Sequence, residues 1–218
     1  MRNKFDQQLA QLNHEMIEMG ALCEEVIALS SQALTEGDTA LVAKVAPLDS
    51  EIDHKEREIE NLCLKLLLRQ QPVARDLRQI SAALKMITDM ERIGDQAEDI
   101  AEIVAFLDGR QAENDALLKE MAKAVIQMVT ESVDAYVKCD IMLAKKVIAA
   151  DDVVDEQFAR VKQSLIGKIA ADPADGEYAL DLLMIAKYYE RIGDHATNIA
   201  EWVIYSVTGT HKDEITLT

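Results

Sequence analysis

The residues best suited to chemistry in this chain are carboxylates that occur twice at the same spacing. The segment Glu91–Glu102 returns 99 residues later as Glu190–Glu201, with nine of twelve positions identical. Each copy begins Glu-Arg-Ile-Gly-Asp, so its two acids lie at positions i and i+4 and share one face of a helix, with a glycine between them. The repetition indicates that the chain is one module built twice.

A partner helix in the first half brings further acids to the same height. Asp49 and Asp53 are also four residues apart, and Pro72 marks the turn between their helix and the next. Asp53 and Glu91 are both 19 residues from this proline, and Asp49 and Asp95 are both 23 residues from it. An antiparallel hairpin that turns at Pro72 therefore predicts that the four acids converge.

The second half repeats this arrangement independently. Asp151 with Asp194, and Asp155 with Glu190, share one midpoint between Asp172 and Pro173. Two hairpins with different turns thus predict the same cluster of carboxylates.

These acids are expected to need a counter-charge. Asp49 lies between Val45 and Ile52, and Asp151 between Val147 and Val154, in a heptad pattern whose positions should be apolar. Clustered, partly desolvated carboxylates repel one another. Arg92 and Arg191 each follow the first glutamate of their motif by one residue, which places them about 100° around the helix from it. They are therefore expected only to flank the clusters. All-oxygen ligation suits Mg²⁺, Ca²⁺, Mn²⁺ or iron, and the sequence does not choose among them. The alternative is that the acidic stripes are solvated helix faces.

Known catalytic patterns do not fit these residues. A ferritin-like di-iron oxidase requires Glu-x-x-His pairs on two helices, and the chain has none. A Ser-His-Asp set, a phosphate-binding glycine loop and a Cys-x-x-Cys motif are also missing. The sequence therefore predicts a protein that is not an enzyme.

The elements that position these acids are helices. Three prolines and eight glycines interrupt a sequence rich in helix formers, and aromatic residues make up 4%. The pattern predicts an all-α protein of six long helices, arranged as two tandem three-helix bundles that are related by internal duplication. The first bundle is expected at residues 1–108 and the second at 109–218. Asp38 and Asp140 are predicted helix caps, and Pro47 a kink.

Charge and cysteine usage restrict the setting. The net charge of −17 disfavours direct contact with nucleic acid. The three cysteines are widely spaced in the helical pattern, which is typical of reduced core thiols. No segment has the ~18 apolar residues that direct membrane insertion requires. A cytoplasmic location is expected.

Taken together, the two Glu-Arg-Ile-Gly-Asp helices, their Asp-x-x-x-Asp partners and the turn Gln71–Arg78 resemble the PhoU family over nearly the whole chain. The resemblance implies a cytoplasmic accessory protein of the high-affinity phosphate ABC transporter, peripheral at the inner face of the membrane through its protein partners. Such a protein negatively regulates phosphate uptake and helps to silence the phosphate-starvation sensor histidine kinase. A homodimer is also implied.

The resemblance further implies a multinuclear metal cluster, with iron or zinc favoured over manganese or magnesium. The candidate metal-binding residues are Asp49, Asp53, Glu91, Asp95, Asp99, Asp151, Asp155, Glu190, Asp194 and Asn198. Because Asn198 stands where the first copy has Asp99, the second cluster is expected to carry one charge fewer. The rival hypothesis is a carboxylate-rich bundle for metal storage or metal-dependent redox chemistry.

Overall fold

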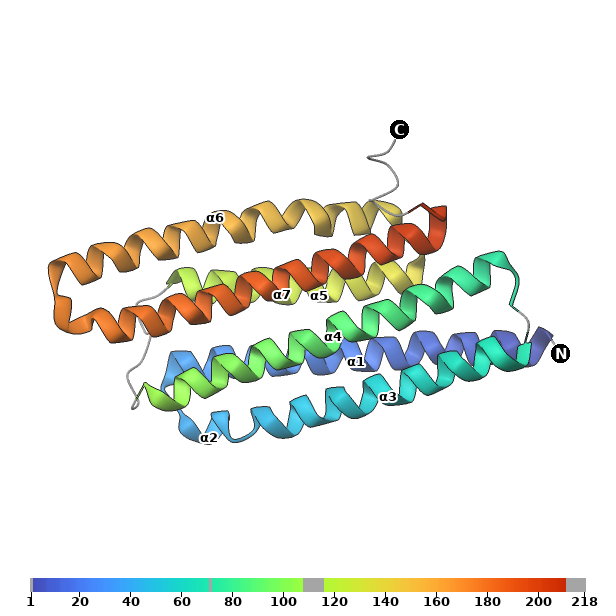
Figure 1. Cartoon of the computed structure of the whole chain (residues 1–218), viewed down its shortest axis with the longest axis horizontal. Coiled ribbons are helices and arrows are strands. Elements are labelled where there is room, and N and C mark those ends of the chain that lie inside the picture. Colours follow the sequence, from blue (N-terminus) through green and yellow to red (C-terminus); the bar gives the residue numbers. More distant parts are fainter. Residues whose placement is uncertain (1, 71, 108–115, 211–218) are drawn as a thin grey trace.

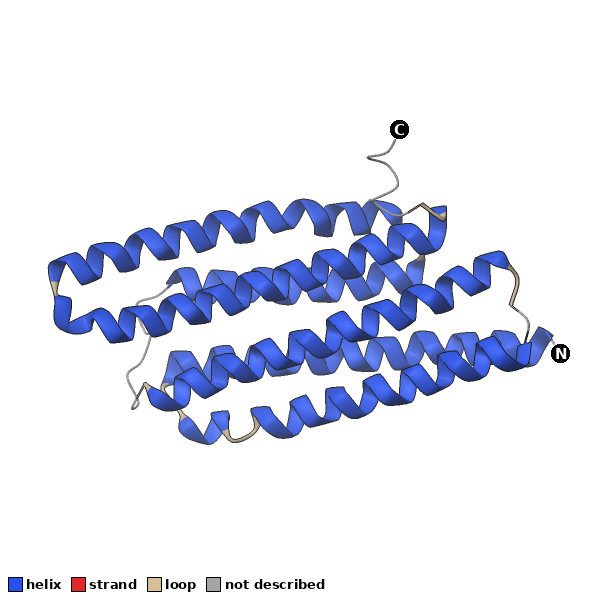
Figure 2. Cartoon of the chain, viewed as in Figure 1, coloured by secondary structure: helices blue, strands red, loops and turns tan. Residues whose placement is uncertain are grey.

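Helices make up nearly all of the chain in a computed structural model that describes residues 2–70, 72–107 and 116–210 (Figure 2). The first half contains α1 (Arg2–Glu36), α2 (Thr39–Val42), α3 (Val45–Gln70) and α4 (Ala74–Phe106). The second contains α5 (Ala116–Lys138), α6 (Ile141–Ala171), a 3₁₀ turn (Pro173–Asp175) and α7 (Gly176–Thr208). No strand occurs within the described ranges. The predicted all-α fold with six long helices is confirmed.

The long helices form two antiparallel sets of three that lie side by side (Figure 1). One set contains α1, α3 and α4, and the other contains α5, α6 and α7. The sets meet chiefly where α4 packs along α7, and α1 also contacts α5. The boundary predicted between residues 108 and 109 lies outside the described residues.

Apolar residues in a heptad pattern form the buried core. Along α1, Leu12, Met16, Met19, Cys23 and Val26 are fully buried, as the alternating steps of four and three residues require. Two buried serines on the same kind of seam, Ser30 in α1 and Ser132 in α5, each donate a hydrogen bond to the backbone carbonyl three residues earlier. Burial of these hydroxyls therefore leaves no donor unsatisfied.

Pro47, which was predicted to kink a helix, instead follows a break that separates two helices, α2 and α3. The chain is helical up to Val42, leaves the helical conformation at Ala43 and Lys44, and is helical again from Val45. A proline ring clashes with the carbonyl four residues earlier, which for Pro47 is the carbonyl of Ala43. The break falls at that carbonyl and leaves Pro47 in the first turn of α3, where its missing N–H removes no helical hydrogen bond.

The two halves use the same connection before their second helix. Asp38 accepts a hydrogen bond from the N–H of Ala40, and Asp140 accepts from Met142 and Leu143, so both predicted caps are confirmed. The residue before each cap has a positive φ: Gly37 at 64° and Cys139 at 52°. Cys139 therefore lies in a turn, not in a helix as its sequence pattern had indicated.

Replacing Cys139 with glycine is expected to stabilise the protein by about 0.5–1 kcal/mol, because a side chain at positive φ is strained and glycine is not. Chemical denaturation at equilibrium measures the change. Gly37→Ala at the corresponding position is the matched control and should destabilise by a similar amount. A Cys139→Gly protein that is less stable than the parent would contradict the strain argument.

Candidate metal centres

The first hairpin, α3 with α4, brings six carboxylates together on one side. They interact electrostatically with one another, and we call them the first cluster: Asp49, Asp53, Glu56, Glu91, Asp95 and Glu98. The four acids that were predicted to converge here do so.

Asp49 lies deepest in the first cluster. Burial, together with the charges of Glu98, Asp95, Asp53 and Glu91, raises the pKa of Asp49 to about 7. Its Oδ1 atom is buried and has no hydrogen-bond partner among the described residues. A half-buried carboxylate that has no basic partner among the described residues and is surrounded by like charges favours either a proton or a cation.

Glu56 and Glu98 also belong to the first cluster, although neither was among the acids predicted to lie there. Glu98 makes a side-chain hydrogen bond with Asp49, and burial and neighbouring acids raise the pKa of both glutamates. Each lies seven residues after the first acid of its stripe, Asp49 or Glu91. This spacing could have identified both glutamates from the sequence, because positions i, i+4 and i+7 share a helix face as well as i, i+4 and i+8 do.

The first cluster has basic neighbours closer than expected. Arg92 was predicted only to flank the acids, but its guanidinium lies 2.7 Å from Asp95 and 3.4 Å from Glu91. Arg57 likewise pairs with Asp53 at 3.1 Å. The Arg92 and Arg57 side chains are 55% and 68% exposed, so they lie at the solvent edge, and no basic residue of the described ranges pairs with Asp49.

The second hairpin, α6 with α7, brings together the four acids predicted for it. This second cluster comprises Asp151, Asp155, Glu190 and Asp194. Burial and the charges of the other three, with a smaller effect from Asp152, raise the pKa of Asp151 to about 6. Burial and Glu190 also raise the pKa of Asp194, against the opposing effect of Lys187.

The glycine of each motif allows the partner helix to approach. A Cβ atom at Gly94 would lie only 2.6 Å from Asp49 Oδ1, and one at Gly193 would lie 3.3 Å from Asp151 Oδ1. Each helix-interior glycine therefore leaves room for the deepest acid of its cluster, Asp49 or Asp151, to come close to the backbone of the opposite helix.

We expect Gly94→Ala to destabilise the protein by about 1 kcal/mol, because the new methyl group displaces the half-buried Asp49 side chain. Gly193→Ala is the matched control. There the contact is looser, and the gain in helix propensity, ~1 kcal/mol, offsets it. Urea denaturation compares the two variants with the parent. Equal effects of the two substitutions would contradict a tighter fit at Gly94.

Asp99 and Asn198 both lie at the contact between α4 and α7, and Asp99 also interacts electrostatically with Asp95 and Glu98 of the first cluster. Burial, Glu102 and Asp95 raise the pKa of Asp99, while Arg191 and a hydrogen bond from Tyr188, both on α7, lower it. In the reciprocal contact, Asn198 Nδ2 donates to Asp89 Oδ1 at 3.1 Å. Both residues therefore join the two halves of the molecule.

His195 adds a second bond at this contact, since its Nδ1 lies 2.9 Å from the same Asp89 oxygen. The hydrogen bond of His195 is therefore made with the other half of the molecule, although its charge also acts on Asp194. The basic residue Arg78 also spans the halves. Its Nε donates to the carbonyl of Ser206 at 3.4 Å, near the last turn of α7.

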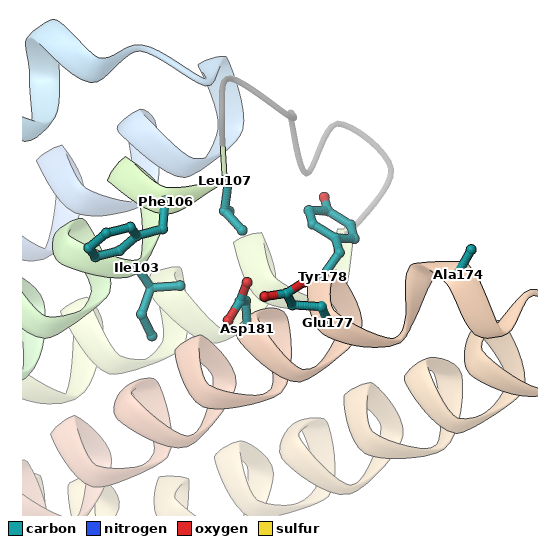
Figure 3. A pocket seen from close by; sticks show the side chains of 7 residues that line it. All are labelled: Ile103, Phe106, Leu107, Ala174, Glu177, Tyr178 and Asp181. Carbon is teal, nitrogen blue, oxygen red and sulfur yellow. The ribbon is translucent and has the colours of Figure 1, made fainter.

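A surface pocket lies apart from both clusters, between the end of α4 and the start of α7 (Figure 3). Its lining includes Ile103, Leu107, Glu177 and Asp181, beside a Phe106 side chain that is 81% exposed. Phe106 is eleven residues beyond Asp95, a distance of ~16 Å along a helix. The pocket and the carboxylates are therefore separate features.

Neither cluster is arranged as a finished metal site. In the described ranges, no three histidine, cysteine or carboxylate side chains are placed to hold one ion as they stand. Their chemistry nevertheless fits a hard cation, because the donors are all oxygen and Oδ1 of Asp49 is buried without a hydrogen-bond partner in the described ranges. Within the same ranges, no helix is both long and apolar enough to cross a membrane.

Fold and site together define a class of protein: a duplicated three-helix bundle whose paired hairpins carry acidic clusters. The chain belongs to the PhoU family, since the model of the PhoU domain matches residues 16–104 and again 118–203. The resemblance inferred from the motifs is confirmed.

Curated relatives and solved structures agree with this membership over the full length. The chain is 36% identical to a "phosphate-specific transport system accessory protein PhoU homolog" of Clostridium acetobutylicum, covering 97% of this chain and 98% of the relative. The crystal structure of PhoU from Pseudomonas aeruginosa is 34% identical, with a TM-score of 0.88 over 94% of this chain and 100% of that one. The "phosphate transport system regulatory protein PhoU" of Streptococcus pneumoniae is 25% identical, with a TM-score of 0.87 over 95% and 98%. These relatives are named for an accessory or regulatory role, not for an enzymatic activity.

Proposed function

We propose that this chain is an accessory protein that negatively regulates high-affinity phosphate uptake and phosphate-starvation signalling. Its partners are the subunits of a phosphate ABC transporter and a phosphate sensor histidine kinase, which it contacts as a homodimer at the cytoplasmic face of the membrane. The observation that carries the proposal is full-length similarity to proteins named as accessory to phosphate-specific transport. The chain acts as a rigid helical adaptor and catalyses no reaction.

A deletion strain of the native host tests the regulatory role. In medium replete with phosphate, loss of the gene should derepress a phosphate-starvation reporter and raise the uptake of labelled phosphate. Expression of the intact chain should restore both. A deletion strain that keeps the reporter silent and phosphate uptake unchanged would overturn the assignment.

We further propose that both clusters bind metal ions. Asp49, Asp53, Glu91 and Asp95 would hold them in the first hairpin, and the four acids of the second cluster in the other. Glu56 and Glu98 add two donors to the first. The ions supply the counter-charge that the clusters lack, and the carboxylates must change rotamer to coordinate them. The raised pKa and the unpaired Oδ1 of Asp49 support the proposal.

Elemental mass spectrometry of untagged protein, as purified and after chelation, tests metal binding directly. A fixed small number of iron, zinc, manganese or magnesium ions, whose removal lowers the thermal midpoint, is the expected result. Many ions per chain, or redox turnover, would instead favour a metal-storage or redox bundle, for which the number of clustered carboxylates is the supporting observation. Metal-free protein of unchanged stability would leave solvated acidic faces.

A further inference from the structure

The two clusters differ at two of their corresponding positions. In the first half, Glu56 follows Asp53 by three residues and Glu98 follows Asp95 by three, and both belong to the first cluster. With the helices of the two halves aligned, Phe158 stands at the position of Glu56 and Thr197 at that of Glu98. The second hairpin therefore replaces two carboxylates with an aromatic ring and a hydroxyl.

A lysine accompanies this loss of charge. Lys187 lies one turn before Glu190 on α7 and forms an ion pair with it. The ammonium group also lies 5.7 Å from the centre of the Phe158 ring, the residue that replaces Glu56. An ammonium group at this distance from an aromatic face is attracted to it. Ring and carboxylate thus hold Lys187 at the edge of the second cluster.

The charge of Lys187 reaches the acids beyond its direct partner. It counteracts the rise in the pKa of Asp194 that burial and Glu190 produce. The corresponding residue on α4 is Thr88, which carries no charge. The cations of the first cluster, Arg57 and Arg92, accompany six carboxylates, whereas Lys187 accompanies four.

We propose that Lys187 is a built-in counter-ion of the second cluster, so that the two clusters bind divalent cations unequally. The first cluster fills first, and the second binds more weakly because the ammonium group opposes an incoming ion. This inference rests on the proposed metal binding. Its basis is the combination of Lys187, Glu190 and Phe158, which has no equivalent among the described residues of the first hairpin.

Mn²⁺ is a suitable probe, because the electron paramagnetic resonance signal of the free ion is lost on binding and bound ions are counted directly. Chelated wild-type protein titrated with Mn²⁺ should show a tight and a weak class of sites. Asp95→Asn should remove the tight class and keep the weak one. Lys187→Thr, which introduces the residue found at position 88, should then tighten the weak class about tenfold, because a unit charge close to a divalent ion is removed.

Two further variants complete the test. Lys146→Thr removes another lysine of α6 and α7, one that pairs with Glu131 away from the cluster, and should leave both classes unchanged. Thr88→Lys should weaken the tight class. Position 88 is exposed and the Lys187 side chain is 44% exposed. Circular dichroism should therefore show the parent fold for Thr88→Lys and for Lys187→Thr.

Some outcomes would overturn only the role of Lys187, and another would also overturn metal binding by the clusters. Mn²⁺ that stays free in the presence of the wild-type protein would overturn both. Mn²⁺ binding in one class of equal sites, or a weak class that does not respond to Lys187→Thr, would overturn the role of Lys187 and leave metal binding in place. Equal tightening by Lys146→Thr would show a general effect of surface charge and would likewise overturn it.

Discussion

Asp49→Asn is expected to stabilise the metal-free protein at pH 8 by about 2 kcal/mol and to abolish most of the stabilisation that metal ions provide. The pKa of Asp49 is about 7 instead of its usual 3.8. Each unit of such a shift corresponds to ~1.4 kcal/mol against the charged form, and partial exposure to solvent reduces the sum by about half. Asparagine keeps the shape of the side chain, removes the charge and has an N–H to donate to Glu98.

The thermal midpoint in a chelator, and again with saturating Mn²⁺, measures both parts of this prediction. For a protein of this size, 2 kcal/mol corresponds to about 5 °C. Glu51→Gln is the control, because Glu51 lies on the same helix but is exposed and outside the cluster. If Asp49→Asn lowers the midpoint in chelator, the carboxylate is stabilising in its own right and the cluster needs no cation.

Asp49→Asn is expected to stabilise the metal-free protein and to weaken the stabilisation by metal ions, and this difference explains why an acid occupies a core position. Asp49 stands in the heptad pattern between Val45 and Ile52, both of which are buried. An apolar residue there would stabilise the helix hairpin, and charges in such positions are costly unless they are paired. A residue that reduces stability in the free protein and contributes to binding is characteristic of a functional site.

Much of this arrangement could be predicted from the sequence because two constraints coincide. Turns at Pro72 and at Pro173 set the register of each hairpin, and i, i+4 spacing sets the face. Asp49 therefore had to lie near Asp95, and Asp151 near Asp194, as they do. Helix caps were predictable for a similar reason, since an aspartate directly before a helix satisfies backbone N–H groups that nothing else reaches.

The limits of the cluster were not predictable in the same way. An α-helix has 3.6 residues per turn, so i+7 and i+8 lie on opposite sides of the same stripe. Glu98 and Asp99 are such a pair on α4. Sequence spacing does not say which side faces α3 and which faces α7, and the packing of the two halves decides it. Glu98 thus contacts Asp49, while Asp99 contacts Tyr188 across the molecule.

The length of the arginine side chain explains why Arg92 pairs with cluster acids that it was expected only to flank. A neighbour in sequence points about 100° away at Cα, which suggested that Arg92 could not neutralise the acids beside it. A long side chain with a planar guanidinium bends back along the surface of its own helix, and Arg92 reaches Asp95 three residues on. Direction at the backbone is a good guide for aspartate and a poor one for arginine.

The stability of the metal-free protein is expected to fall as the pH rises from about 4 to 7, which is the opposite of the usual behaviour of carboxylates paired with bases. Burial and neighbouring charges raise the pKa of Asp49 to about 7 and that of Asp151 to about 6. In the unfolded chain both titrate near 3.8. Between these values the folded state binds more protons than the unfolded state, so the free energy of unfolding decreases with pH.

Thermal midpoints in chelator across this range measure the effect, and a fall of about 5 to 10 °C is expected for the two groups together. Glu18 and Glu131 act in the other direction. Hydrogen bonds from Lys55 lower the pKa of Glu18, and those from Gln127 and Lys146 outweigh burial at Glu131. Their contribution is present above the unfolded value of 4.5 and is lost only as the pH falls below it, so it does not alter the slope between pH 5 and 7.

The double variant Asp49→Asn, Asp151→Asn provides the decisive comparison, because it should make the pH dependence much less steep without any change of chelator or metal. The remaining slope comes from acids such as Glu56, Glu98 and Asp194, whose pKa values are also raised. Metal ions bind the deprotonated carboxylates, so saturating Mn²⁺ should flatten or reverse the slope of the wild-type protein while leaving that of the variant unchanged. A midpoint that rises with pH in the chelated wild-type protein would contradict the cause assigned here. The same acids would then be paired or solvated in the native state, and the clusters would have no deficit of positive charge for a metal ion to relieve.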